Sequence, residues 1–253
     1  MTDVALEHVL RSPLLTEVGG LVHGFTTRGL GSMAGSLRPS SEQARNRRLL
    51  AERLGLRLVR VRQVARAEAV LVEGGRATRL PDGPSAAVGD PMELEADALL
   101  SRERGVALAI AVADCVPVLI ATPDGWVAIA HAGWEGTARR LTAAVCDALA
   151  ARGADLRAAR AFLGPSIGPC CYTIDRVRAD QVRARLGAAD LLERDGQVVF
   201  DLWSANRRQL ENAGVGRVEL SGLCTRDEVA RFFSHRGEQG RAGRGLAFIG
   251  WRQ

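Results

Sequence analysis

The pattern of apolar and polar residues predicts strands and helices interspersed along the whole chain. Apolar residues recur at helical spacing in some segments, whereas others are short apolar runs bounded by turn residues, as in strands. The predicted helices are 42–54, 137–152, 176–186 and 202–213, with Thr137 as the N-cap of the second. The predicted strands are 57–64, 69–73, 106–112, 115–121, 126–131, 160–163, 197–200, 216–220 and 246–251. We therefore expect an α+β (mixed α/β) fold, a single domain over residues 1–253 with mixed β-sheets flanked by helices.

Two segments refine this picture. Both faces of the strand 106–112 are apolar, because Val, Leu and Ile alternate with Ala, so we expect it inside a sheet. The segment 74–93 is rich in Gly, Pro and Ala, and we expect it to be a surface loop.

The composition excludes several kinds of catalytic site. All 34 basic residues are Arg, so an enzyme that depends on a Schiff-base or phosphate-loop lysine is excluded. The chain has only 4 His, too few for the several copper centres of a multicopper oxidase. The 5 Cys are sparse in 253 residues, which favours a reducing, cytoplasmic location over a disulfide framework. The sequence shows no signal peptide and no membrane-spanning apolar run.

The net charge of +5 raises the question of a nucleic-acid partner. Such a partner requires basic residues gathered on one face, usually with stacking aromatic residues. Here aromatic residues are 4% of the chain and the arginines are scattered. We therefore expect no nucleic-acid partner. We also expect no membrane partner and a monomer.

The strongest local prediction is a β-hairpin that carries a thiol and an imidazole. Two apolar runs flank Thr122-Pro123-Asp124-Gly125, a turn in which Pro presets φ and Gly accepts a positive φ. A turn centred on Pro123 and Asp124 pairs residues whose numbers sum to about 247. His131 then lies opposite or next to Cys115, and opposed β-carbons are only about 4.5–5.5 Å apart.

Three interpretations of this pair remain open at this point. The pair could bind zinc, which takes both thiolate and imidazole ligands. It could instead be a nucleophile and its base, as in cysteine hydrolases. It could also be a buried, unreactive Cys beside a hydrogen-bonded His.

The residues that follow favour an active site. Residues 132–137, AGWEGT, form a small-residue segment that leads into a helix start, where free N–H groups bind anions such as phosphate. Trp134 could stack on a flat substrate or pack in the core. Residues 164–172, GPSIGPCCY, predict a rigid loop that another group can approach closely. Its adjacent Cys170 and Cys171 are either packed at a strand edge or spare thiolate ligands.

Several motifs in a fixed order carry a resemblance to a known family. They are HGFTTR at 23–28, ADCVPVL at 113–119, HAGW at 131–134, GPSIGP at 164–169 and CT at 224–225. Together they resemble the laccase-domain family, also called the polyphenol oxidase or peptidoglycan-editing factor family, or zinc-dependent purine nucleoside phosphorylase. The resemblance extends from about residue 21 to the end of the chain.

The resemblance implies a mixed α/β domain with one zinc ion rather than a multicopper centre. Its members phosphorolyse adenosine, inosine, guanosine and methylthioadenosine, and some deaminate adenosine. Cys115 and His131 match two of the three family zinc ligands, and Arg28 and Asn46 match polar positions around the family site.

The chain departs from the family pattern at two positions of this site. The third ligand of the family is the His of Gln-Val-His, where this chain has Gln63-Val64-Ala65. Glu135 also stands where the family usually has Arg. A zinc ion would be held weakly unless His23, Cys170 or Cys171 completes its ligand set.

The resulting hypothesis is a purine nucleoside phosphorylase, weakened by the loss of one ligand. Cys115, His131 and Arg28 are its catalytic candidates, and Asn46, Trp134 and Thr137 its substrate-binding candidates. Phosphate is expected between Arg28 and the helix start near Thr137. The alternatives are a metal-free Cys–His hydrolase and a nucleoside-binding pseudoenzyme; editing of peptidoglycan precursors is a further possibility.

Overall fold

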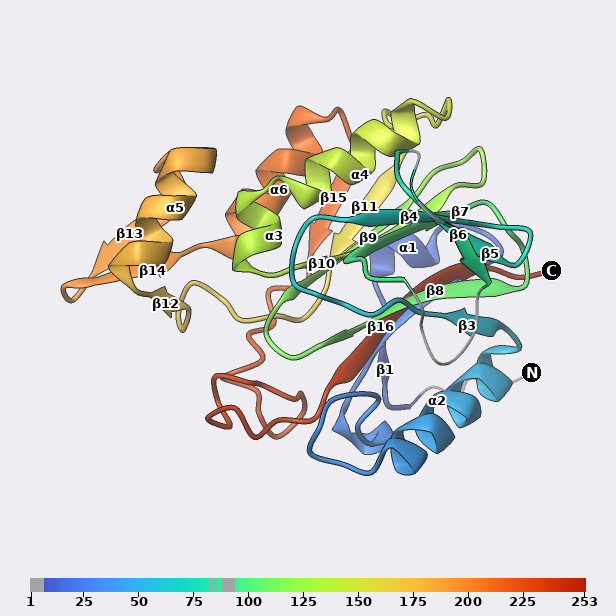
Figure 1. The fold of residues 1–253 in the computed structure, drawn as a ribbon, viewed down its shortest axis with the longest axis horizontal. Coiled ribbons are helices and arrows are strands. Elements are labelled where there is room, and N and C mark those ends of the chain that lie inside the picture. Colours follow the sequence, from blue (N-terminus) through green and yellow to red (C-terminus); the bar gives the residue numbers. More distant parts are fainter. Residues whose placement is uncertain (1–6, 82, 84, 88–93) are drawn as a thin grey trace.

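Two β-sheets packed face to face form the centre of the molecule, and helices cover both outer sides (Figure 1). The structure is a computed structural model that describes residues 7–81, 83, 85–87 and 94–253. One sheet has the strand order β15-β11-β9-β10-β7-β4-β5-β6, the other β1-β2-β16-β8-β3, and a small third sheet β12-β14-β13. Parallel pairs (β11/β15, β4/β7, β3/β8) occur beside antiparallel ones. The predicted α+β class with mixed sheets is therefore confirmed.

The helices and strands have the following bounds. The helices are α1 Pro13–Thr16, α2 Ser40–Leu54, α3 Trp134–Ala138, α4 Leu141–Ala150, α5 Arg176–Leu186 and α6 Leu202–Asn212, with a 3-10 turn at Arg28–Leu30. The strands are β1 Val9–Leu10, β2 Leu21–Thr26, β3 Arg57–Val59, β4 Ala69–Glu73, β5 Arg76–Arg79, β6 Ser85–Ala87, β7 Ala98–Ser101, β8 Val106–Val112, β9 Val116–Ala121, β10 Val127–Ala132, β11 Arg160–Leu163, β12 Thr173–Ile174, β13 Leu191–Arg194, β14 Gln197–Phe200, β15 Arg217–Leu220 and β16 Gly245–Trp251. No helix among these described residues is long and apolar enough to cross a bilayer.

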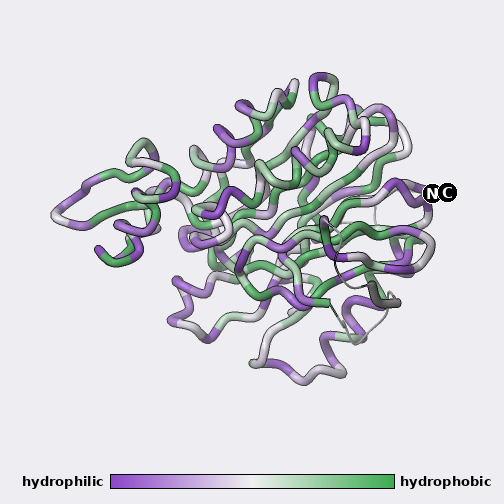
Figure 2. The backbone as a smooth tube through the Cα atoms, turned by 45° about the horizontal axis from the view of Figure 1, so that its top comes forward, coloured by the Kyte–Doolittle hydropathy of each residue, from purple (hydrophilic) through white to green (hydrophobic). Residues whose placement is uncertain are grey.

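Three apolar layers hold the sheets and helices together. One lies between the larger sheet and the helices α3, α4 and α6, and a second lies between the two sheets. The third lies between the five-stranded sheet and α2. Figure 2 shows hydrophobic residues along the central strands and hydrophilic ones gathered in the peripheral helices and loops. The strand β8 contributes Leu108 to the second layer and Ala109 to the third, which confirms the prediction that both of its faces are buried.

Most predicted elements are present, but the segment 74–93 is not simply a loop. It contains β5 and β6, which extend the larger sheet by antiparallel pairing. Residues 82, 84 and 88–93 of this segment lie outside the described residues. The strand predicted over 57–64 was too long, since β3 ends at Val59.

The single helix predicted over 137–152 was also wrong, because the chain breaks between α3 and α4. Arg140 adopts a left-handed conformation with φ 61°, and the N-cap of α3 is Gly133 rather than Thr137. Gln209 of α6 donates to the Thr137 carbonyl at 3.0 Å and accepts from the Ala143 N–H at 3.2 Å. A side chain thus satisfies main-chain groups that a continuous helix would have paired.

The hairpin forms at the predicted turn, in a shifted register. Gly125 has φ 96°, as the turn requires, and its N–H donates to the Thr122 carbonyl. His131 pairs with Pro117, so paired residue numbers sum to 248 rather than 247. Cys115 is therefore diagonal to His131 rather than directly across from it.

Candidate functional site

A cavity of about 990 Å³ opens where the hairpin β9–β10, the five-stranded sheet and several loops meet. Its walls come from segments that are far apart in the sequence, including the segment after β3, the end of β8, the loop before β12 and the loop between β15 and β16. Its lining residues include Arg47, Arg60, Arg62, Ala65, Asp114, Cys115, His131, Trp134, Ile167, Tyr172, Arg178, Leu202, His235, Arg236 and Arg244.

Cys115 and His131 both line this cavity, so the structure brings the predicted pair together. Their diagonal relation still allows contact, because residues of one sheet face can meet across a hairpin. The absence of a side chain at Gly133 makes room, since a Cβ built there would lie 3.0 Å from the Cys115 sulfur. Helix α3 begins directly after this glycine, at Trp134.

Asp97 orients His131, although no sequence pattern predicted this role. Its fully buried carboxylate lies 3.0 Å from His131 Nδ1 and also accepts hydrogen bonds from the backbone N–H groups of Ala65 and Arg66, at 2.9 and 2.7 Å. An ionised carboxylate only accepts hydrogen bonds, so Nδ1 carries the proton. This leaves Nε2 as the nitrogen available to a ligand, in the way that carboxylates orient metal-binding histidines.

The charges around His131 favour its protonated form. Burial alone would lower the pKa of this imidazole, but the Cys115 thiolate, followed by the Asp97 carboxylate, raises it to about 10.

Ala65 lies at the cavity wall and cannot bind a metal. It has φ 57°, a left-handed conformation in which its N–H reaches Asp97. Among the described residues, no third His, Cys, Asp or Glu forms a ligand group with Cys115 and His131. His23 lies in the core on β2, and neither Cys170 nor Cys171 lines the cavity.

The residues present therefore fit only two positions of a three-ligand zinc site. They fit a multicopper centre even less, because only His131 and His235 of the four histidines line the cavity. His235 is exposed and lies in the loop between β15 and β16.

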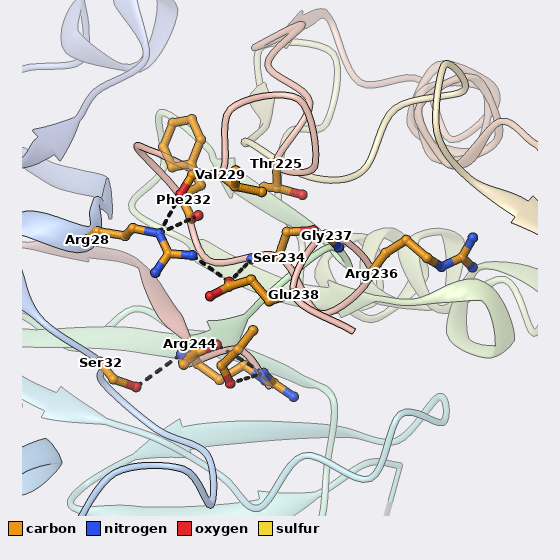
Figure 3. A network of polar contacts seen from close by, with 12 residues as sticks. Arg28, Ser32, Thr225, Val229, Phe232, Ser234, Arg236, Gly237, Glu238 and Arg244 are labelled. Atoms are coloured by element: carbon orange, nitrogen blue, oxygen red, sulfur yellow. Dashed lines mark hydrogen bonds and ion pairs between the residues drawn. The ribbon is translucent and has the colours of Figure 1, made fainter. Parts of the chain in front are cut away.

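Three of the predicted site residues do not line the cavity. Arg28 donates from Nε to the carbonyls of Val229 and Phe232 and forms an ion pair with Glu238 at 2.5 Å (Figure 3). Asn46 donates to the Ser32 carbonyl at 3.0 Å. Thr137 is fully buried and accepts a hydrogen bond from Asn206. The placement of phosphate between Arg28 and Thr137 therefore finds no support in the geometry.

Arginine and aromatic side chains give the cavity its other properties. Six of its lining residues are Arg, whereas Asp114 is the one lining acid among the described residues. Trp134, which was predicted to contact substrate, lies at the cavity with the Arg178 guanidinium 5.6 Å from its ring. Arg236 lies 5.2 Å from the ring of Tyr172. Burial raises the pKa of Tyr172, which keeps its hydroxyl neutral.

Asp114 precedes β9 and has a left-handed conformation, with φ 88°. Its carboxylate accepts hydrogen bonds from Thr225 Oγ1, Ser234 Oγ and the Arg236 N–H, at 2.7, 2.7 and 2.6 Å. These contacts join the ADC motif to the segment that follows the CT motif. Asp114 thus holds a wall of the cavity in place.

The comparison with known proteins agrees with this geometry. The family model described as multi-copper polyphenol oxidoreductase laccase matches residues 23–252. The chain therefore belongs to this laccase-like family, as its motifs predicted.

Individual relatives carry names that point to nucleosides. The purine nucleoside phosphorylase YlmD of Geobacillus stearothermophilus is 38% identical over 256 residues, which cover 95% of this chain and 89% of that protein. The crystal structure of YlmD from the same organism matches with a TM-score of 0.84 and 33% identity, over 100% of this chain and 98% of that one. A protein named adenosine deaminase RL5, from an unknown prokaryotic organism, is 37% identical over 147 residues, 55% of this chain and 56% of that protein.

Proposed function

We propose that this chain is a purine nucleoside phosphorylase that binds nucleoside and phosphate in the cavity of about 990 Å³. The observation that carries the proposal is the meeting of Cys115 and His131 in one arginine-lined cavity, with Asp97 buried behind the imidazole. The relatives named purine nucleoside phosphorylase support the substrate class. Adenosine, inosine, guanosine and methylthioadenosine are the nucleosides to test.

The excess of arginines suits the anionic co-substrate. Arg47, Arg60 and Arg62 line the cavity, and guanidinium groups bind phosphate oxygens in bidentate fashion. In phosphorolysis a phosphate oxygen forms a bond to the anomeric carbon while the bond from that carbon to the base nitrogen breaks. The electron pair leaves with the base, which takes up a proton, and the sugar 1-phosphate is released. Arginines that hold phosphate in place favour this step by orientation.

The aromatic wall suits a purine base. Trp134 and Tyr172 offer flat faces, and the apolar side chains of Ile167 and Leu202 line the cavity with them. Offset stacking on such rings binds any purine, so these residues contribute affinity rather than discrimination between bases.

Cys115 and His131 are the residues that would hold zinc, through Sγ and Nε2. A bound zinc ion would act there as a Lewis acid. Because Ala65 leaves the ligand set incomplete, we expect weak zinc binding and low activity. Asp97 keeps the imidazole in the ligating orientation whether or not the ion is bound.

The alternative of a metal-free Cys–His hydrolase also has a specific observation in its favour. Asp97, His131 and Cys115 follow one another in the order of an acid, imidazole and thiol triad. Iodoacetamide labelling of the metal-free and zinc-loaded protein separates the two functions. An activated nucleophile labels first and regardless of zinc, whereas a zinc ligand is protected once zinc is added.

The deciding experiment is chromatographic measurement of free base released from inosine and adenosine, with and without phosphate, at measured zinc content. We expect release that depends on phosphate and is lost in Cys115→Ser and His131→Ala. The variant Cys146→Ser, in α4 and outside the cavity lining, is the matched control. If no nucleoside yields free base with zinc in excess, the phosphorylase proposal is wrong. Calorimetric binding of nucleoside without turnover would then identify a pseudoenzyme, and hypoxanthine nucleoside formed from adenosine would identify a deaminase.

A further inference from the structure

A second group of metal-binding side chains lies outside the cavity. Cys170, Cys171, Cys224 and Asp227 place their three sulfurs and a carboxylate oxygen within 4.8 Å of one another. Cys170 and Cys171 belong to the loop after β11, whereas Cys224 and Asp227 follow β15. None of the four lines the cavity that holds Cys115 and His131.

We propose that these four side chains bind a structural zinc ion. Zinc in structural sites is tetrahedral with four protein ligands, mostly Cys and His, and it also accepts Asp. With Zn–S bonds of about 2.3 Å, adjacent ligand atoms of a tetrahedron are roughly 3.8 Å apart. The spacing of this group needs only a small contraction to reach that value. Four protein ligands leave no open position, so the ion would be structural rather than catalytic.

The main chain positions this group before any metal binds. Ser166 and Cys224 form a bridge between the two segments, in which the Thr225 N–H donates to the Ser166 carbonyl at 3.1 Å. The Gly168 N–H donates to the Cys224 sulfur at 3.3 Å, a contact that stabilises a thiolate. Ligands held by backbone hydrogen bonds lose little further freedom when they bind the ion.

The carboxylate of Asp227 already lies beside two of the cysteine sulfurs with which it would bind the ion. Its two oxygens accept from the thiols of Cys171 and Cys170, at 3.0 and 3.1 Å. A single zinc ion would replace these shared protons and bind all four groups together. A disulfide explains the group less well, because adjacent cysteines do not readily pair with each other. A disulfide would also leave the position of the Asp227 carboxylate unexplained.

Neighbouring arginines offset the charge of the loaded site. Three thiolates and one carboxylate around a divalent ion carry a net charge of −2. Arg194 and Arg226 line a second cavity, of about 410 Å³, together with Cys170 and Cys171. Arg194 also donates to the carbonyl of Pro169, which holds its positive charge next to the group.

The ion would join two segments that form one wall of the larger cavity. Ile167 and Tyr172 flank the first pair of cysteines, and His235 and Arg236 follow the second pair of ligands on the same segment. A metal that fixes Cys171 to Cys224 therefore fixes this wall. The inference does not depend on the reaction proposed above, because it concerns different ligands.

The test starts from the double variant Cys115→Ala/His131→Ala, which removes the ligands of the cavity. We expect this protein, purified under reducing conditions, to retain about one zinc per chain by elemental analysis. Replacing zinc with Co²⁺ should give thiolate-to-metal charge-transfer absorption about three times that of a single-thiolate site, since three cysteines bind. Adding Cys171→Ser and Cys224→Ser should abolish both the zinc and the absorption.

A milder variant keeps the proposal testable if the buried substitutions impair folding. Cys170 is exposed, so Cys170→Ser should fold and lower the Co²⁺ absorption by about a third, since two thiolates remain. Cys146→Ser, in the same background, should change neither reading. The proposal is overturned if the double variant binds neither zinc nor Co²⁺ under reducing conditions. It is equally overturned if thiol-trapping mass spectrometry finds Cys171 and Cys224 disulfide-bonded in freshly isolated protein.

Discussion

Replacing Asp97 by Asn tests whether this residue organises the cavity. Asn has the same shape but no charge, and one of its two oxygens becomes an NH2 group. In the native protein one oxygen of Asp97 faces Ala65 N–H and His131 Nδ1, and the other faces the Arg66 N–H. Either orientation of the amide sets its NH2 against at least one N–H donor. The site is fully buried, so water cannot replace the lost acceptor.

The magnitude follows from these contacts. A hydrogen bond to a charged group contributes about 1.5–3 kcal/mol, and a buried group left unpaired costs about 1–3 kcal/mol. We therefore expect Asp97→Asn to lower the free energy of unfolding by about 2.5–6 kcal/mol. If the cavity binds zinc, its affinity should also fall by about 10–100-fold, because the imidazole is no longer oriented.

Urea unfolding in zinc-free buffer, followed by tryptophan fluorescence, measures the first effect. The matched control is Glu95→Gln, which removes an exposed ion pair with Arg62 and should cost less than about 1 kcal/mol. If Asp97→Asn is no less stable than this control, the assigned role of Asp97 is refuted.

Three further changes have defined outcomes. Burial lowers the pKa of His23 to about 4, whereas a His in the unfolded chain has a pKa near 6.5. The unfolded chain therefore binds more protons below pH 6.5. From pH 7 to pH 5, the contribution of His23 should lower the free energy of unfolding by about 2 kcal/mol. Urea titrations of His23→Gln should lack this part of the pH dependence, and an unchanged slope contradicts the assignment. Ala65→His adds the third ligand at a φ that His tolerates, so zinc titration should show at least about tenfold tighter binding to the cavity, and base release should increase. Gly250→Ala places a Cβ 2.0 Å from the Val106 carbonyl and should destabilise by about 3 kcal/mol in a urea titration, whereas Gly19→Ala, with no atom within 4 Å, should not.

The sequence predicted those elements best whose signal is local. The bounds of β4, β8, β11, β14 and α5 agree with the predicted ranges, because short apolar runs and helical spacing mark them directly. The break between α3 and α4 had no such signal, since residues 137–152 have good helical spacing throughout. It depends on Gln209, which lies far away in the sequence, and tertiary contacts of this kind override local propensity.

In the candidate site, too, the residues that could be predicted are those that lie close together in the sequence. Cys115 and His131 were found because a two-strand hairpin brings them together within 17 positions of the sequence. Asp97 directly precedes β7, on the other side of β10, so only the pairing of β7 with β10 reveals its role. An acidic residue directly before the short, mostly apolar segment Ala98–Ser101 was the one signal that could have identified it. The joining of Cys170 and Cys171 with Cys224 likewise depends on a contact between two loops.

Because the chain breaks between α3 and α4, the position of Trp134 in the cavity does not depend on α4, the next helix in the sequence. Trp134 sits on a five-residue helix whose far end is held by Asn206 and Gln209 rather than by continuation into α4. The position of Trp134 in the cavity wall therefore depends on α6. Changes on the buried face of α6, which also carries the cavity residue Leu202, would therefore alter the position of Trp134 in the cavity.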